Sequence, residues 1–311
     1  MRCVISSDTS LHARPIGGAW VDQTDLAPSV TLAVVSFLAI GAVLWRYRQH
    51  RAHGSLTLAI AALCLGVAFS IRAALTNSAD YSPATLTAEQ AFFLLALTFL
   101  LWGHILFSRS FVRRAALIHW PSTLLILAAV VLLVAVIIGL VALAQSSDAP
   151  AAWRQSGGPT EADQMRVASA ALELAVAVLH ALLLPLAKIV APELPFLELG
   201  LLDLSAWFLF VPAFYLFCIT AVTDDSSPLV CSQIFFYLAS GLFPLLALAV
   251  LVALPFPRWG FGLVPRDLLA GAGFLPGVRD AEEARLLREA RELVAGEGGH
   301  GPYDDWSLRL R

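Results

Sequence analysis

Five ionisable residues within or at the edge of long apolar stretches of this sequence are candidates for chemistry: Arg72, Glu89, Glu173, His180 and His104. A charged side chain at the centre of a bilayer costs at least about 2.5 kcal/mol on insertion scales, so such residues are rare there. Where they do occur, they form ion pairs, bind polar ligands or carry protons. These residue types therefore suit recognition or proton transfer within a membrane.

The positions of these residues along their segments predict how they group. Arg72, Glu89 and Glu173 are all expected in the outer half of the membrane, and an acidic partner would offset the charge of Arg72. We therefore predict an outer-half polar cluster of these three residues. His180 follows Glu173 by seven residues, two turns deeper on nearly the same helix face, and would extend the cluster inward. His104 lies toward the inner end of its segment, about 60° around the helix from Glu89.

This cluster has two interpretations. In the first, it is one buried ion pair that orients the helices, and Glu89 only reaches toward the membrane surface. In the second, it lines a ligand-binding crevice or a proton-linked path. The sequence leaves both open.

The apolar stretches predict an all-α fold, a polytopic transmembrane bundle of seven helices. Hydrophobic residues make up 59% of the 311 positions and charged residues only 14%, whereas soluble proteins carry about 25% charged residues. A helix crosses the hydrocarbon core with about 20 apolar residues and pairs its own backbone groups. The predicted spans are Pro28 to Trp45, Ser55 to Thr76, Ala91 to Ser108, Pro121 to Ala144, Val167 to Ala187, Leu199 to Val222 and Leu229 to Phe256.

Basic residues follow alternate spans, which predicts the orientation of the bundle. The connections after the first and third spans contain Arg46, Arg48, Arg51, Arg109, Arg113 and Arg114. The connection after the sixth span has Asp224 and Asp225 and no basic residue. Since cytoplasmic loops collect Lys and Arg, the N-terminus is expected outside and the C-terminus in the cytoplasm.

Three regions follow from this topology: an extracytoplasmic arm (residues 1–27), the transmembrane domain (28–256) and a cytoplasmic tail (257–311). Within the tail, residues 280–295 have the apolar periodicity of an amphipathic helix, and Asp280 and Glu283 have capping-box spacing. This helix either rests on the bundle or docks a cytosolic protein partner.

Several chemistries lack the residues that they require. No nucleophile–base set, metal-ligand spacing or phosphate loop is visible, so neither an enzyme nor a metal or other cofactor is predicted. The only lysine, Lys188, falls at the inner end of the fifth span, where it does not suit a retinal Schiff base. The net charge of −3 and the absence of a basic face argue against nucleic acid as a partner. Cys218 and Cys231 lie near the outer ends of consecutive spans, where a disulfide and two free thiols are both open.

Four segments carry a resemblance to a known group of proteins. They are residues 69–72 (Phe-Ser-Ile-Arg), 86–93 (Leu-Thr-Ala-Glu-Gln-Ala-Phe-Phe), 107–114 (Phe-Ser-Arg-Ser-Phe-Val-Arg-Arg) and 231–237 (Cys-Ser-Gln-Ile-Phe-Phe-Tyr). In these segments and their order, residues 28–256 resemble fungal seven-span integral membrane proteins of unknown function, which are distantly RTA-like. RTA-like members would imply lipid or sterol-related export or a stress response.

Three functions remain compatible with the residues. The first is a receptor-like or sensor protein with an outer polar crevice for a small amphiphilic ligand. The second is a transporter or lipid translocator, and the third is a non-catalytic structural or interaction protein. Membrane lipids are expected partners in all three. Pro185, Pro212 and Pro244 lie within predicted spans, where each either packs or bends its helix.

Overall fold

The computed structural model describes residues 23–50, 53–76, 83–115, 120–148, 161–190, 196–221 and 232–254. The helices are η1 (Gln23–Asp25), α1 (Leu26–His50), α2 (His53–Leu75), α3 (Pro83–Ala115), α4 (Trp120–Asp148), α6 (Glu161–Val190), α7 (Phe196–Ala221), α9 (Gln233–Phe236), the π-helix η2 (Tyr237–Leu242) and α10 (Phe243–Ala253). The last three follow one another without a break and form a single rod. All of them belong to one compact unit, Met1–Gly262.

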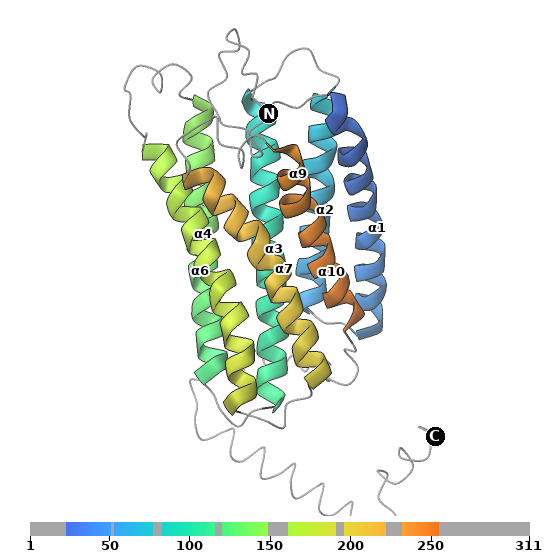
Figure 1. The fold of residues 1–311 in the computed structure, drawn as a ribbon, viewed down its shortest axis with the longest axis vertical. Coiled ribbons are helices and arrows are strands. Elements are labelled where there is room, and N and C mark those ends of the chain that lie inside the picture. Colours follow the sequence, from blue (N-terminus) through green and yellow to red (C-terminus); the bar gives the residue numbers. More distant parts are fainter. Residues whose placement is uncertain are drawn as a thin grey trace, which may run out of the picture. The chain divides into compact units, whose positions relative to one another are not determined.

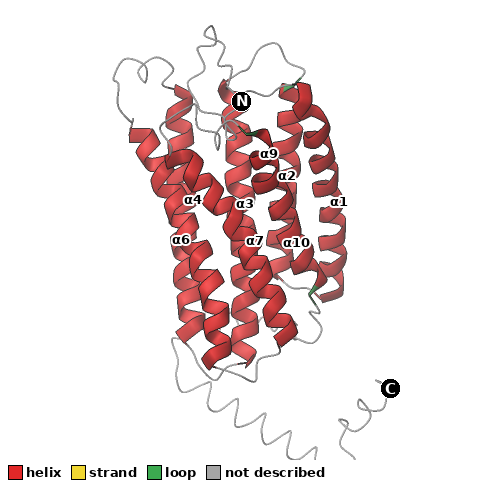
Figure 2. Cartoon of the chain, in the orientation of Figure 1, coloured by secondary structure: helices red, strands yellow, loops and turns green. Residues whose placement is uncertain are grey.

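Seven of these segments are long and apolar enough to cross a membrane, which confirms the predicted helical bundle. Figure 2 shows helices throughout the described part of the chain, with no strand among them. Two helices start more than one turn before their predicted spans. α3 begins at Pro83, where proline suits the first turn because its missing N–H needs no acceptor there. α6 begins at Glu161, and its first-turn acids Glu161 and Asp163 favour the positive end of the helix dipole.

The helices are packed in chain order, and the last one closes the bundle (Figure 1). Each helix from α1 to α7 contacts the next, while α10 packs against α7 and also reaches α1, α2 and α3. α3 occupies the middle of the arrangement, with α2, α4, α6, α7 and α10 around it. Polar residues on α3 can therefore meet partners from most of the bundle.

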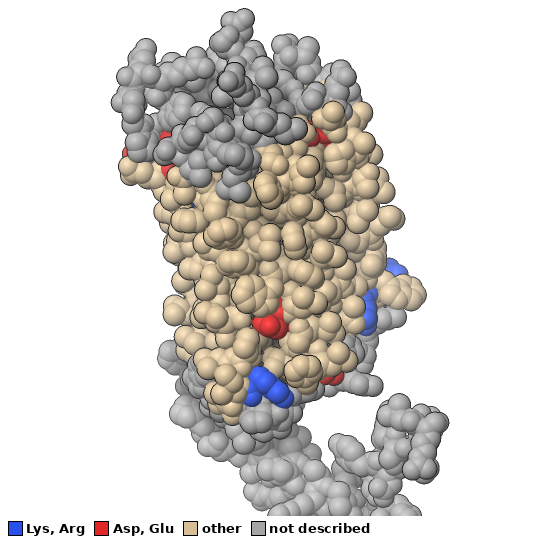
Figure 3. All heavy atoms as spheres, in the orientation of Figure 1, with Lys and Arg blue, Asp and Glu red and all other residues tan. Residues whose placement is uncertain are grey.

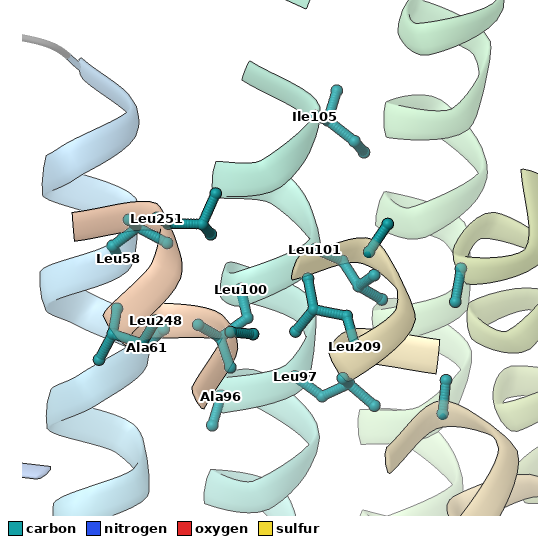
Figure 4. Packing of buried hydrophobic residues seen from close by; sticks show 14 of the residues in the cluster. Leu58, Ala61, Ala96, Leu97, Leu100, Leu101, Ile105, Leu209, Leu248 and Leu251 are labelled. Carbon is teal, nitrogen blue, oxygen red and sulfur yellow. The ribbon is translucent and has the colours of Figure 1, made fainter. Parts of the chain in front are cut away.

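The core is made of leucine and alanine side chains, as Figure 4 shows for Leu100, Leu101, Leu209 and Leu248. Small residues bring α2 close to α3. A Cβ added at Gly103 of α3 would lie 2.7 Å from Leu58 Cδ2 of α2. Near its C-terminal end, α2 also contacts the first turns of α3, where Arg72 meets Glu89.

The outside of the bundle is apolar as well. Leu38 on α1 is 71% exposed and Leu127 on α4 is 56% exposed, and the face in Figure 3 shows few charged side chains between its two ends. An exterior of this kind would be costly in water but is solvated by lipid acyl chains. The protein is therefore a multi-pass membrane protein.

Some predictions fall outside the part of the chain that the structure describes. These are residues 1–22 of the predicted arm, the tail with its helix at 280–295, and Cys231. Cys218 is a free thiol. The sidedness of the bundle stays a prediction, which tags at Ser10 and His300 would test because they should report opposite sides of the membrane.

Candidate functional site

Arg72 lies near the end of α2 and forms two buried ion pairs. Its Nη1 is 3.0 Å from Glu89 Oε1 on α3, and its Nη2 is 3.1 Å from Asp25 Oδ2 in η1. The side chains of Arg72 and Asp25 are fully buried, and that of Glu89 is 2% exposed. Buried charges require this kind of compensation, since one unpaired charge in an apolar interior is strongly destabilising.

Aromatic and hydroxyl groups complete the coordination of the guanidinium. Arg72 Nε donates to Tyr237 Oη at 3.3 Å, and Tyr237 Oη donates to the Asp25 carbonyl at 3.2 Å. Because the phenol has one hydrogen, the Ser29 hydroxyl at 2.8 Å is the donor in its contact with Tyr237. The Phe236 ring covers the cation, with its centroid 4.2 Å from Arg72 Cζ.

We call Asp25, Ser29, Arg72, Glu89, Phe236 and Tyr237 the arginine cluster. It joins η1, α1, α2, α3 and the α9–η2 segment through groups that surround the Arg72 guanidinium. Of the three residues in the predicted cluster, Arg72 and Glu89 are in contact. The predicted outer crevice at Arg72 is wrong, because the guanidinium is fully buried and surrounded by its own partners.

Two details of the predicted cluster are also wrong. Glu173 is not a member, since Arg72 binds Asp25 and Glu89 instead. Asp25 falls within the predicted arm (residues 1–27). In the structure it belongs to η1, directly before α1, and its side chain is fully buried in the bundle. An acid at the outer start of a span, at the expected depth of Arg72, was the signal available in the sequence.

Glu173 lies on α6 and faces α3, fully buried. Thr98 Oγ1 lies 3.1 Å from Glu173 Oε1 and 2.8 Å from the Leu94 carbonyl oxygen. No described residue hydrogen-bonds Glu173 Oε2. Among the described residues, this carboxyl group therefore contacts a single hydroxyl and forms no ion pair.

His180 and His104 meet on the same side of α6, with ring centroids 5.2 Å apart at an interplanar angle of 82°. Carbonyl oxygens only accept hydrogen bonds, so the partners of each ring identify its protonated nitrogen. His104 Nε2 donates to the Leu202 carbonyl at 3.0 Å, and its Nδ1 accepts from Ser108 Oγ at 3.3 Å. His180 Nδ1 donates to the Val176 carbonyl at 2.9 Å, while its Nε2 has no partner among the described residues.

These contacts form a polar line between α3 and α6. Arg166, Glu173 and His180 are spaced by seven residues, which places them on one face of α6. Arg166 lies two helical turns before Glu173, and its Nη2 donates to Gln90 Oε1 of α3 at 3.1 Å. The predicted shared face of Glu173 and His180 is therefore confirmed, and it faces α3 rather than an open crevice.

A small pocket lies inside the bundle between α2, α3, α7 and the η2–α10 segment. Its lining residues are Leu65, Phe93, Leu94, Leu97, Pro212, Tyr215, Leu216, Ser240 and Pro244. Tyr215 is 6% exposed, and its hydroxyl has no hydrogen-bond partner among the described residues. Ser240 belongs to the π-helix η2. The sequence pointed to Pro212 and Pro244 but not to Tyr215, because a single tyrosine in an apolar span is an ordinary packing residue.

Within the described helices, no three His, Cys, Asp or Glu side chains lie close enough together to hold a metal ion. Comparisons with protein-family models, with curated proteins and with solved structures give no match. Fold and surface thus define a class, a seven-helix multi-pass membrane protein, while the resemblance to the fungal RTA-like proteins stays a prediction.

Proposed function

We propose that this protein is a receptor-like membrane sensor that binds a small amphiphilic ligand in the pocket between α2, α3, α7 and the η2–α10 segment. The observation that carries this proposal is the Tyr215 hydroxyl, which lines an apolar pocket without a described hydrogen-bond partner. A buried hydroxyl without a partner is destabilising by about 1–3 kcal/mol. A ligand with one hydrogen-bonding group would remove that penalty.

The lining indicates the chemistry of the ligand. Apolar side chains such as Leu65, Phe93 and Leu97 make up most of the wall, and no charged side chain lines the pocket. Its hydroxyls belong to Tyr215 and Ser240. The cavity has a volume of only about 30 Å³, so it would hold the short polar end of a neutral amphiphile, such as the hydroxyl group of a long-chain alcohol or sterol, while the apolar body lies outside it.

The pocket borders the parts of the bundle with irregular backbone. Pro212 lies inside the continuous helix α7, and Pro244 lies in the first turn of α10. Ser240 lies within a π-helical turn, a geometry that is frequent at functional sites. The same π-helix begins at Tyr237, which binds Arg72. A ligand that alters η2 through Ser240 would therefore act on the arginine cluster as well, and this supports a sensor over a passive binding protein.

A transporter would require a polar path through both halves of the bundle. The arginine cluster is closed by its own members, and His180 lies two helical turns beyond Glu173. Leu94 and Leu97, the pocket residues beside Thr98, are apolar. These features favour a ligand that binds within the bundle over one that passes through it.

The test is the melting temperature of the detergent-purified protein with long-chain alcohols, sterols and neutral lipids. Binding to the native state raises the melting temperature by mass action. We expect a stabilising compound for the parent protein and about fivefold weaker binding to Tyr215→Phe, since one hydrogen bond contributes about 1 kcal/mol. Leu97→Trp should fill the pocket and abolish the shift.

The matched control is Tyr237→Phe, which removes a phenol hydroxyl from the arginine cluster and leaves the pocket lining unchanged. It should lower the melting temperature without ligand and keep the ligand-induced shift. Equal shifts in the parent protein, Tyr215→Phe and Leu97→Trp would place the ligand elsewhere and contradict the proposal.

A further inference from the structure

Glu173 is a second buried carboxyl whose surroundings differ from those of Glu89. Along the facing sides of α6 and α3, the ionisable side chains are Arg166 and His180, each seven residues from Glu173 on α6, and His104 of α3, whose ring contacts that of His180. Arg166 binds Gln90. The described side chains of α4, residues 123–145, include no ionisable group. On α7, Glu198 lies in the first turn, and Asp203 directly follows Leu202, whose carbonyl accepts a hydrogen bond from His104. Both are acids and would add negative charge.

The hydrogen-bond geometry around Thr98 also bears on the charge of Glu173. A threonine hydroxyl has one hydrogen, but Thr98 Oγ1 is within hydrogen-bond distance of two acceptor atoms, Leu94 O and Glu173 Oε1. An ionised Glu173 would have to share that hydrogen with Leu94. A protonated Glu173 would donate its own hydrogen to Thr98 Oγ1, and Thr98 would donate to Leu94.

The energetic cost of burying a charge also favours a protonated Glu173. An ionised carboxylate without a cation in an apolar interior is so unfavourable that such groups neutralise. Glu89 escapes this penalty because Arg72 lies 3.0 Å away. Glu173 has only Thr98, and its second oxygen has no partner among the described residues.

We propose that Glu173 is a proton-binding site within the membrane, which holds one proton on its carboxyl group and donates it as a hydrogen bond to Thr98. Binding forms the carboxyl O–H bond from a carboxylate oxygen and a proton, and release reverses it. His180 Nε2, which the Val176 hydrogen bond leaves as the unprotonated ring nitrogen, is the next proton-accepting atom on the same face of α6.

This proton site adjoins the pocket. Leu94 accepts the Thr98 hydroxyl hydrogen through its carbonyl oxygen, while its side chain lines the pocket together with Leu97. Loss of the proton would draw the Thr98 hydroxyl toward the carboxylate and away from Leu94. Ligand binding and proton binding would then influence each other, and such coupling is reciprocal by thermodynamic necessity. The proton site itself does not depend on the proposed ligand.

The direct test is the infrared spectrum of the full-length protein in lipid vesicles at pH 7, in H₂O and in D₂O. A protonated carboxyl group has a C=O stretching band that is distinct from carboxylate bands and shifts in D₂O. We expect this band in the parent protein, its loss in Glu173→Gln and its retention in Glu89→Gln. The same band in Glu173→Gln and the parent protein, or no such band in the parent protein, would overturn the proposal.

Thermal stability gives a second readout that does not depend on the spectral assignment. Glutamine resembles the protonated acid in shape and in its ability to donate to Thr98, so Glu173→Gln should melt within a few degrees of the parent protein. Glu89→Gln removes a charge that Arg72 needs and should melt much earlier. A loss in Glu173→Gln as large as that in Glu89→Gln would mean that Glu173 is ionised.

Thr98→Val provides a variant that keeps Glu173 itself. Valine matches threonine in shape but lacks the hydroxyl that accepts the carboxyl hydrogen. The protonated-carboxyl band should persist in this variant and move to a different frequency. An unchanged frequency would contradict the hydrogen bond between Glu173 and Thr98.

Discussion

The arginine cluster and the polar line between α3 and α6 differ in how their buried ionisable groups are compensated. Around Arg72, two carboxylates, a phenol and an aromatic ring satisfy the guanidinium from four segments of the bundle. Along α6, Glu173 Oε2 and His180 Nε2 are buried with no partner among the described residues. A satisfied network holds helices in place, whereas a buried polar atom without a partner is a site where a proton or ligand can bind.

The largest expected effect follows from removing the centre of the arginine cluster. Arg72→Leu leaves two buried carboxylates without their cation, and we expect a loss of about 3–5 kcal/mol in unfolding free energy. Combining it with Asp25→Leu and Glu89→Leu should restore most of that loss. Unfolding in detergent by heat or denaturant measures both.

This rescue separates the observed cluster from the one expected from sequence. Arg72→Leu combined with Glu173→Leu should not recover stability, because Glu173 does not contact Arg72. Rescue by Glu173→Leu but not by the Asp25 and Glu89 replacements would contradict the observed pairing.

A smaller effect is expected where α4 approaches the polar line. A Cβ added at Gly139 would lie 2.6 Å from Ser169 Oγ on α6 and 2.7 Å from Leu94 Cδ2 on α3. Gly139→Ala should therefore reduce the unfolding free energy by about 1–3 kcal/mol through overpacking. Gly200→Ala is the matched control, because nothing lies within 4 Å of an added Cβ there. It should instead stabilise its helix by about 0.5–1 kcal/mol, and equal effects at both sites would contradict the tight packing of α4.

The last comparison is between two tyrosines, Tyr237 of the arginine cluster and Tyr215 of the pocket. Tyr237→Phe removes a hydroxyl that binds Arg72, Ser29 and Asp25, so we expect a loss of about 1–3 kcal/mol. Tyr215→Phe removes a hydroxyl without a described partner and should be neutral or slightly stabilising when no ligand is present. Parallel thermal melts of the two variants measure the difference. A larger loss in Tyr215→Phe would show that its hydroxyl is already satisfied.

The spacing of residues along the sequence predicted part of the site. The seven-residue spacing of Glu173 and His180 was enough to place them on one face of α6, because helix periodicity does not depend on the rest of the fold. The requirement of Arg72 for acidic partners was also predictable, since a lone arginine is unfavourable in lipid. Which acids these are was not predictable, because Asp25 and Glu173 both lie at plausible depths and only helix packing distinguishes them.

The sequence by itself determined the class of this protein, since seven apolar segments of membrane-spanning length can bury their backbone groups in lipid only as helices. The tertiary structure alone decided which faces meet. It closed the arginine cluster with Asp25 and Tyr237, directed Glu173 toward Thr98, and enclosed Tyr215 in a pocket. The physical reason is that spacing fixes a residue's depth and its face on one helix, whereas contacts between helices depend on how several helices rotate and pack together.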